Sequence, residues 1–124
     1  MCGICGIIES GTDNRSLVER MVGILAHRGP DAYSVHQDKD VCLGHRRLSI
    51  IDLATGDQPV FTPERDLCIV YNGEVYNYKE LRDELEERGY SFKTASDTEV
   101  VLRLYEADGM ASFARLNGIF AFAI

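Results

Sequence analysis

Short apolar runs with strand character alternate along the whole chain with three segments of helical periodicity. Six runs predict β-strands, because they are rich in apolar and β-branched residues and end at turn residues: near residues 2–8, 34–37, 41–45, 60–62, 67–71 and 118–124. Three capping-box spacings predict helix starts: Ser16 with Glu19, Asn77 with Glu80, and Ser96 with Glu99. A chain of 124 residues can bury one modest core, so we expect a single α+β domain.

The segments between these runs predict how the strands connect. A charged turn at residues 38–40 indicates a hairpin between the second and third strands. Residues 49–59 carry Asp, Gly and Pro without periodicity and indicate an ordered loop. The last strand is almost continuously apolar and no polar segment follows it, so we expect a domain truncated at its C-terminus relative to a longer parent protein.

Charge and hydropathy exclude several classes of partner. The formal net charge of -7 argues against nucleic acid, because phosphate binding needs clustered Lys and Arg. No apolar stretch approaches the roughly 20 residues of a membrane helix, and the N-terminus lacks the basic region of a secretory signal. We therefore expect a cytoplasmic protein with free thiols and a small zwitterionic substrate, acting without a membrane.

The position of Cys2 favours a chemical role. Methionine ahead of cysteine is usually excised, which would leave Cys2 with a thiol and a free α-amine that can take the thiol proton. The alternative is a cysteine that packs as a small hydrophobe. A pair with Cys5 is geometrically poor, because strand residues three apart face opposite sides and lie about 10 Å apart, beyond the roughly 7 Å limit of a disulfide.

Six strings in register resemble the class II glutaminase domain of asparagine synthetases. They are Cys2-Gly-Ile, His27-Arg-Gly-Pro-Asp31, His45-Arg-Arg-Leu-Ser-Ile-Ile-Asp52, Gln58-Pro59, Asn72-Gly-Glu-Val-Tyr-Asn77 and Ser96-Asp-Thr-Glu99. The resemblance spans almost all of residues 1–124 and implies an N-terminal nucleophile hydrolase fold, a four-layer αββα sandwich. The strand and helix pattern is compatible with that fold but does not single it out.

The resemblance implies three catalytic positions. Cys2 would be the nucleophile, and the side-chain amide of Asn72 with the backbone N–H of Gly73 would form the oxyanion hole. Taken alone, Asn72-Gly73 is also typical of a hairpin turn at the end of a strand.

The substrate-binding positions follow from the same resemblance. Arg47 would clamp the α-carboxylate of glutamine, Asp97 would pair with the α-ammonium, and Glu74 would assist. The pocket lining would include Leu48, Ser49, Ile50 and Ile51. Without the resemblance, Arg47 could be a surface arginine and Asp97 a helix cap. Arg28 would order the loops around the site, and the three histidines would be structural.

The implied reaction is hydrolysis of L-glutamine through a Cys2 thioester, with no cofactor or metal in this chain. In the family, ammonia passes to a C-terminal synthetase domain that uses ATP and Mg to activate aspartate, and we expect that domain to be absent here. The chain has no Ser-Gly-Gly-x-Asp pyrophosphate loop. Two alternative functions remain open: an amidotransferase domain with another acceptor, and a non-catalytic domain of the same fold. A homo-oligomer also remains open.

Overall fold

The computed structural model describes residues 2–48 and 57–124 of the chain. In chain order its elements are β1 (Gly3–Ile8), α1 (Arg15–Ile24), η1 (Leu25–His27), β2 (Ala32–Asp38), β3 (Val41–Arg47), β4 (Val60–Phe61), β5 (Cys68–Val75), α2 (Tyr78–Glu87), α3 (Asp97–Asp108), η2 (Gly109–Arg115) and β6 (Gly118–Ala123). The two η elements are short 3-10 helices. None of the described helices is long and apolar enough to cross a membrane.

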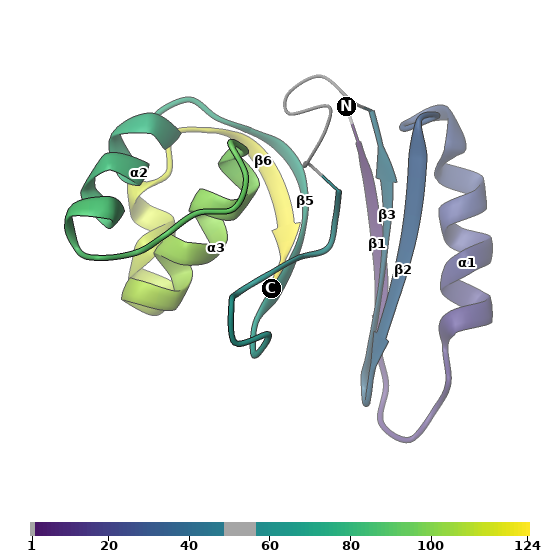
Figure 1. The fold of residues 1–124 in the computed structure, drawn as a ribbon. Helices are drawn as coiled ribbons and strands as arrows, with labels where there is room; N and C mark the ends of the chain where they lie inside the picture. Colours follow the sequence, from purple (N-terminus) through teal and green to yellow (C-terminus); the bar gives the residue numbers. More distant parts are fainter. Residues whose placement is uncertain (1, 49–56) are drawn as a thin grey trace.

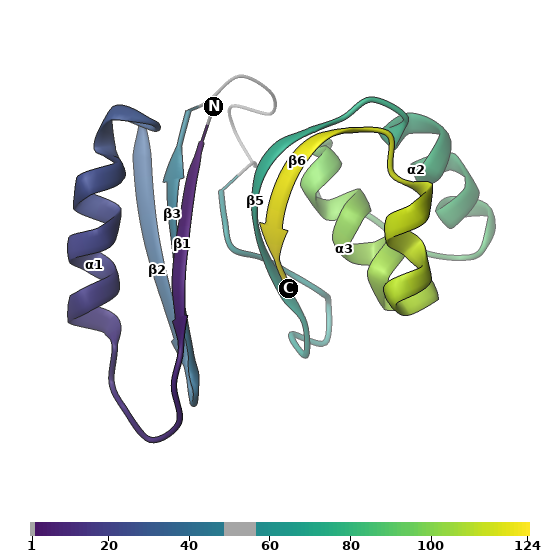
Figure 2. The same ribbon diagram turned by 180° about the vertical axis from the view of Figure 1, so that it is seen from behind.

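Two antiparallel sheets and three α-helices make an α+β fold. One sheet has the order β1-β3-β2 and the other the order β4-β5-β6. Helix α1 lies on the outer face of the first sheet, whereas α2 and α3 lie on the outer face of the second (Figure 1). The reverse view shows the same arrangement, and β5 contacts both β1 and β3 across the gap between the sheets (Figure 2).

The first sheet packs closely against α1. Val18 and Val22 of the helix contact Cys42, and Cys5 and Val35 complete this small core. A side chain at Gly44 would place its Cβ 2.4 Å from Val22 and 2.8 Å from both Val18 and the sulfur of Cys5. Glycine is therefore required there for the helix to lie so close to β3.

The larger core lies between the second sheet and the two helices outside it. Ile69, Tyr71 and Val75 alternate along β5 and all face this core. Helix α2 contributes its two buried leucines, Leu81 and Leu85, at helical spacing. The alternation along β5 and the helical spacing in α2 thus turn these apolar side chains to one face.

Two of the three predicted capping boxes do not form: α1 starts earlier than predicted, and α2 starts after Asn77 as predicted but without a side-chain cap. Helix α1 begins at Arg15 after Asn14, so Ser16 lies inside the helix and caps nothing. Asn77 precedes α2, but its side chain makes no cap and instead binds the backbone of Arg115 and Asn117. Tertiary hydrogen bonds thus outcompete the local cap.

Only the third predicted cap is confirmed. The Ser96 hydroxyl accepts a hydrogen bond from the backbone N–H of Glu99 at 3.4 Å. The Glu99 carboxylate accepts from the backbone amides of Lys93 and Thr94, which lie just ahead of the helix. This arrangement fixes the start of α3, where Asp97 lies.

The two terminal strands each carry an exposed apolar residue. Ile8 at the end of β1 is 82% exposed, and Ile119 in β6 is 67% exposed. Their exposure reflects position, because β1 and β6 are both edge strands of their sheets.

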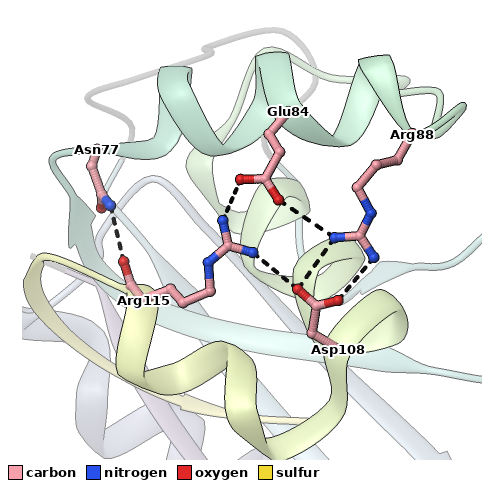
Figure 3. A network of polar contacts seen from close by, with 5 residues as sticks. All are labelled: Asn77, Glu84, Arg88, Asp108 and Arg115. Carbon is pink, nitrogen blue, oxygen red and sulfur yellow. Dashed lines mark hydrogen bonds and ion pairs between the residues drawn. The ribbon is translucent and has the colours of Figure 1, made fainter.

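An ion-pair network holds α2 against the end of α3 and against η2. Arg115 binds both Glu84 and Asp108, and Arg88 binds the same two carboxylates (Figure 3). Arg115 holds the pKa of Glu84 below its usual value, and Arg88 does the same for Asp108. The network and the amide of Asn77 together fix the chain just before β6 begins (Figure 3).

Candidate active site

Strand register brings Cys2 and Arg47 together. β1 and β3 are antiparallel with Gly3 opposite Arg46, so the same register extended by one residue sets Cys2 opposite Arg47. In β3, Leu43, His45 and Arg47 alternate with residues that face α1, and therefore face the second sheet. Cys2 and Arg47 accordingly meet on the inner side, where the two sheets approach each other.

Backbone groups surround the thiol of Cys2. The backbone N–H of Leu48 donates to Sγ at 3.4 Å, and the Leu48 carbonyl lies 3.7 Å from the same atom. The guanidinium of Arg28 donates to the carbonyl of Cys2 through Nε and Nη2, both at 3.4 Å. Arg28 thus anchors the residue that carries the thiol.

Asn72 and Gly73 lie within β5, so the hairpin-turn interpretation of this pair is wrong. They pair with Ala121 and Phe120 of β6. A Cβ at Gly73 would lie 2.4 Å from the carbonyl oxygen of Ile119, so no larger residue fits without moving β6. The Oδ1 atom of Asn72 is buried, and no donor reaches it among the described residues. Buried polar atoms without a partner are uncommon and often mark functional sites.

One cavity of about 220 Å³ joins these groups. From the sequence-predicted set it is lined by Cys2, Arg47, Leu48, Asn72, Gly73, Glu74 and Asp97. Gln58, Tyr71, Tyr76, Ser96, Thr98 and Ile119 complete the lining. Ser49, Ile50 and Ile51, the other predicted lining residues, lie outside the described residues, as does Met1.

Arg47 is not a surface arginine. It is only 8% exposed, and its Nη1 binds Oδ1 of Asp57 at 2.7 Å. The side chain of Asp57 is 80% exposed, so this ion pair sits at the edge of solvent. An ion pair with a well-hydrated partner contributes little to stability.

Asp97 is buried at the first turn of α3, beside its cap residue Ser96. Its Oδ2 accepts hydrogen bonds from the hydroxyl of Tyr71 at 2.8 Å and from the backbone N–H of Val75 at 2.9 Å. Burial, followed by the charge of Asp97, raises the pKa of Tyr71 well above its usual value. Tyr71 therefore stays protonated and acts as the donor.

Sequence reasoning missed the partners that support these predicted residues. Tyr71 lies directly before Asn72, and its buried position in β5 reads as an ordinary apolar strand residue. The side chain of Gln58 accepts from the backbone N–H of Tyr71 at 2.6 Å, and the Gln58 carbonyl accepts from the hydroxyl of Ser34. The Gln58-Pro59 string gave the only signal that Gln58 belonged to the site.

His45 is buried between the sheets and beside Arg47. It is 2% exposed, and its Nε2 has no hydrogen-bond partner among the described residues. Burial, with a smaller contribution from the positive charge of Arg47, lowers its pKa to about 4 against the opposing effects of a hydrogen bond with the Tyr71 backbone and the charge of Asp57. His45 is therefore neutral near pH 7.

We expect His45 to make the fold less stable in acid. Its pKa falls from 6.5 to about 4 on folding, so between these values the unfolded chain binds a proton that the folded chain excludes. Stability should fall by about 2 to 3 kcal/mol as the pH drops through this window. Urea unfolding at pH 7.5 and pH 4.5 measures the loss. The His45→Gln variant, which does not titrate, should lack this component, and an unchanged pH dependence in the variant would contradict the assignment.

The described residues contain one acidic group that could hold a metal ion, formed by Glu64, Asp66 and Glu106. Its oxygens lie within 4.8 Å of one another, and Glu106 already binds Arg103 at 2.6 Å. None of the three lines the cavity beside Cys2. Exposed carboxylates gather in this way without a metal, so the group gives no support for a metal at the cavity.

Comparison with known sequences shows the family. The sequence profile described as Glutamine amidotransferase domain matches residues 1–124. The chain is 43% identical over 129 residues to "Asparagine synthetase [glutamine-hydrolyzing] 1" of Bacillus subtilis (strain 168), covering 100% of this chain and 20% of that protein. It is 39% identical over 127 residues to the protein of the same name from Arabidopsis thaliana, covering 100% of this chain and 21% of the relative. The chain thus spans about a fifth of the length of these relatives.

Two solved structures share the fold. One is titled as the allosteric regulatory enzyme of purine biosynthesis, with a TM-score of 0.75, 22% identity, and coverage of 98% of this chain and 34% of that chain. The other is the glutamine phosphoribosylpyrophosphate amidotransferase of B. subtilis, with a TM-score of 0.73, 24% identity, and coverage of 95% and 34%. The family profile matches every residue of the chain, and one cavity joins residues that the family motifs predicted. The chain therefore belongs to the glutamine amidotransferase domain family.

Proposed function

We propose that this chain hydrolyses the side-chain amide of L-glutamine to glutamate and ammonia, with Cys2 as nucleophile, on a four-layer N-terminal nucleophile hydrolase fold. One observation carries the proposal. The thiol-bearing residue, the Asn72-Gly73 pair and the buried carboxylate of Asp97 line a single cavity in a glutamine amidotransferase domain.

The first step needs a base beside the thiol. After removal of Met1, the α-amine of Cys2 takes the thiol proton, and the sulfur attacks the amide carbon of glutamine. The backbone N–H of Leu48, which donates to Sγ at 3.4 Å, holds the sulfur beside the cavity. The protonated amine then gives its proton to the leaving ammonia, and the γ-glutamyl thioester remains on Cys2.

Charge appears on the carbonyl oxygen during the attack. Asn72 and Gly73 are the proposed donors, the first through its side-chain amide and the second through its backbone N–H. Both belong to β5, whose pairing with β6 holds them in place before substrate arrives. Water then attacks the thioester, with the α-amine again accepting a proton, and glutamate is released.

Two buried charges suit the two ends of glutamine. Arg47 would bind the α-carboxylate with its planar fork, in exchange for the exposed Asp57. Asp97 would bind the α-ammonium, with help from Glu74. Leu48, Ser49, Ile50 and Ile51 would line the rest of the pocket.

The ammonia would supply asparagine synthesis from aspartate. This proposal rests on the relatives at 39% to 43% identity, which are named as glutamine-hydrolysing asparagine synthetases. Adenylation of aspartate would need ATP and Mg, bound by a synthetase domain outside the residues of this chain. The likeness to the purine-biosynthesis enzyme is below 25% identity and gives no support for a sugar-phosphate acceptor.

Steady-state kinetics of glutamate release test this proposal, using chain whose Met1 has been excised. Asn72→Ala should lower kcat by about 10²- to 10³-fold with a smaller effect on KM, because oxyanion donors act mainly in the transition state. Arg47→Ala and Asp97→Ala should mainly raise KM, because they hold groups that do not react. An unchanged kcat for Asn72→Ala would remove it from the oxyanion hole. A wild-type chain that releases no glutamate would refute the proposed reaction.

A further inference from the structure

Within residues 2–48 and 57–124, the hydrogen bonds to the Asp97 carboxylate reach one of its two oxygens. Both hydrogen bonds found among the described residues, from the Tyr71 hydroxyl and the Val75 N–H, go to Oδ2. Both donors are neutral groups, and the carboxylate makes no ion pair with the described residues. Asp97 is only 7% exposed, and burying a carboxylate without a cation is costly. A cationic ligand group at the cavity would supply the missing charge.

Tyr71 is itself fixed in place. The residue is 3% exposed and belongs to the larger core, and its backbone N–H donates to the side chain of Gln58 at 2.6 Å. The register of β4 with β5 pairs Val60 with Ile69, so its extension sets Gln58 opposite Tyr71, just beyond the last pair of β4. The Gln58 side chain thus replaces a strand partner and stops Tyr71 from shifting along the sheet.

The phenol of Tyr71 also stays protonated, so it can donate a hydrogen bond. Burial and the neighbouring charge of Asp97 raise the pKa of the phenol, so it keeps its proton across the neutral range. A protonated phenol at 2.8 Å can only donate to the carboxylate, which fixes the rotation of Asp97 about its side chain.

We propose that Tyr71 is a positioning residue that sets selectivity for an α-ammonium group. Its hydroxyl, with the Val75 N–H, occupies Oδ2 of Asp97 and so turns Oδ1 toward the cavity, where the α-ammonium of the substrate binds. This inference rests on the proposed glutaminase reaction and adds a specific role within it. Tyr71 takes no part in bond making or breaking.

The test compares two substrates in one preparation of the Tyr71→Phe variant, which loses only the hydroxyl. One substrate is L-glutamine, and the other is glutaramate, the same amide without the α-ammonium. We expect KM for glutamine to rise about 10- to 100-fold, the range for loss of a hydrogen bond to a charged group, with kcat changed by less than about twofold. The kcat/KM for glutaramate should change by less than about twofold.

The ratio of the two kcat/KM values does not depend on how much of the sample is folded. Tyr105→Phe is the matched control, because Tyr105 stacks on Phe113 at 5.6 Å and does not line the cavity, so its ratio should equal that of the wild type. An equal loss for both substrates in Tyr71→Phe, or no loss for either, would overturn the positioning role while leaving the glutaminase reaction intact. A wild-type chain inactive on glutamine would instead overturn both proposals.

Discussion

Cys2→Ala should reduce glutamate release to the background rate, a loss of at least about 10³-fold, whereas Cys5→Ala should keep most of the activity. The first substitution removes the sulfur that forms the thioester in the proposed mechanism. No other described cysteine lines the cavity. The oxyanion donors and binding groups that remain give a small residual rate, and this rate limits how large the measured loss can be.

Cys5, which lies in β1 three residues after Cys2, provides a matched control. It faces α1 rather than the cavity, next to Gly44 and Cys42. Burial, followed by the neighbouring Cys42, raises the pKa of the Cys5 thiol, so it is a poor thiolate at neutral pH. Cys5→Ala should therefore cost some stability through lost packing but leave the chemical step intact.

The measurement is glutamate release at saturating L-glutamine, with circular dichroism to verify that both variants fold. Trapping by an electrophilic glutamine analogue, followed by intact mass, adds a direct readout. The wild type and Cys5→Ala should gain the mass of one label, and Cys2→Ala should gain none. Equal activity losses in two well-folded variants would show that Cys2 is not the sole nucleophile.

Local pattern was sufficient to predict the strands but not where they end. The third strand was predicted near residues 41–45, whereas β3 continues to Arg47 and turns it to the same side of the sheet as His45. The charged turn at residues 38–40 predicted the β2–β3 hairpin, which the register from Ala32–Arg47 to Asp38–Val41 confirms. What the pattern could not provide was the pairing of β1 with β3, which sets Cys2 opposite Arg47.

The Asn72-Gly73 pair shows why local rules fail at the site. Asn-Gly is a strong turn signal because both residues tolerate left-handed backbone. Here the chain continues as a strand to Val75, because β6, more than 40 residues later, pairs with every residue from Val70 onward. That long-range pairing overrides local preference, and only the resemblance to a family pointed to it beforehand.

The supporting residues were less visible still. Tyr71 reads as a core strand residue and is one, yet its hydroxyl reaches Asp97, 26 positions later. Asn77 has the identity and place of a helix cap, but its amide binds Arg115 and Asn117. Hydrogen bonds between distant segments have no sequence period, so patterning cannot predict them.

Retention of Met1 should abolish glutamate release by the chain even when the cavity is fully formed. With Met1 attached, the nitrogen of Cys2 is an amide and has no lone pair basic enough to accept the thiol proton. The thiol itself and the Leu48 N–H that donates to it would remain. Activity should fall to the rate of Cys2→Ala, because in the proposed mechanism the same amine also returns the proton to the leaving ammonia.

Two preparations of the full chain, identical in sequence, test this expectation. In one Met1 has been excised, and in the other its excision is blocked by an aminopeptidase inhibitor. Intact mass verifies each, and glutamate release is then measured over a range of pH. The excised form should gain activity as the pH rises through the titration of its α-amine, near 7.7 to 8 for an unperturbed group, while the retained form stays at background. Equal rates in the two forms would show that the α-amine is not the base, and a side chain or a bound water beside Cys2 would then have to take the proton.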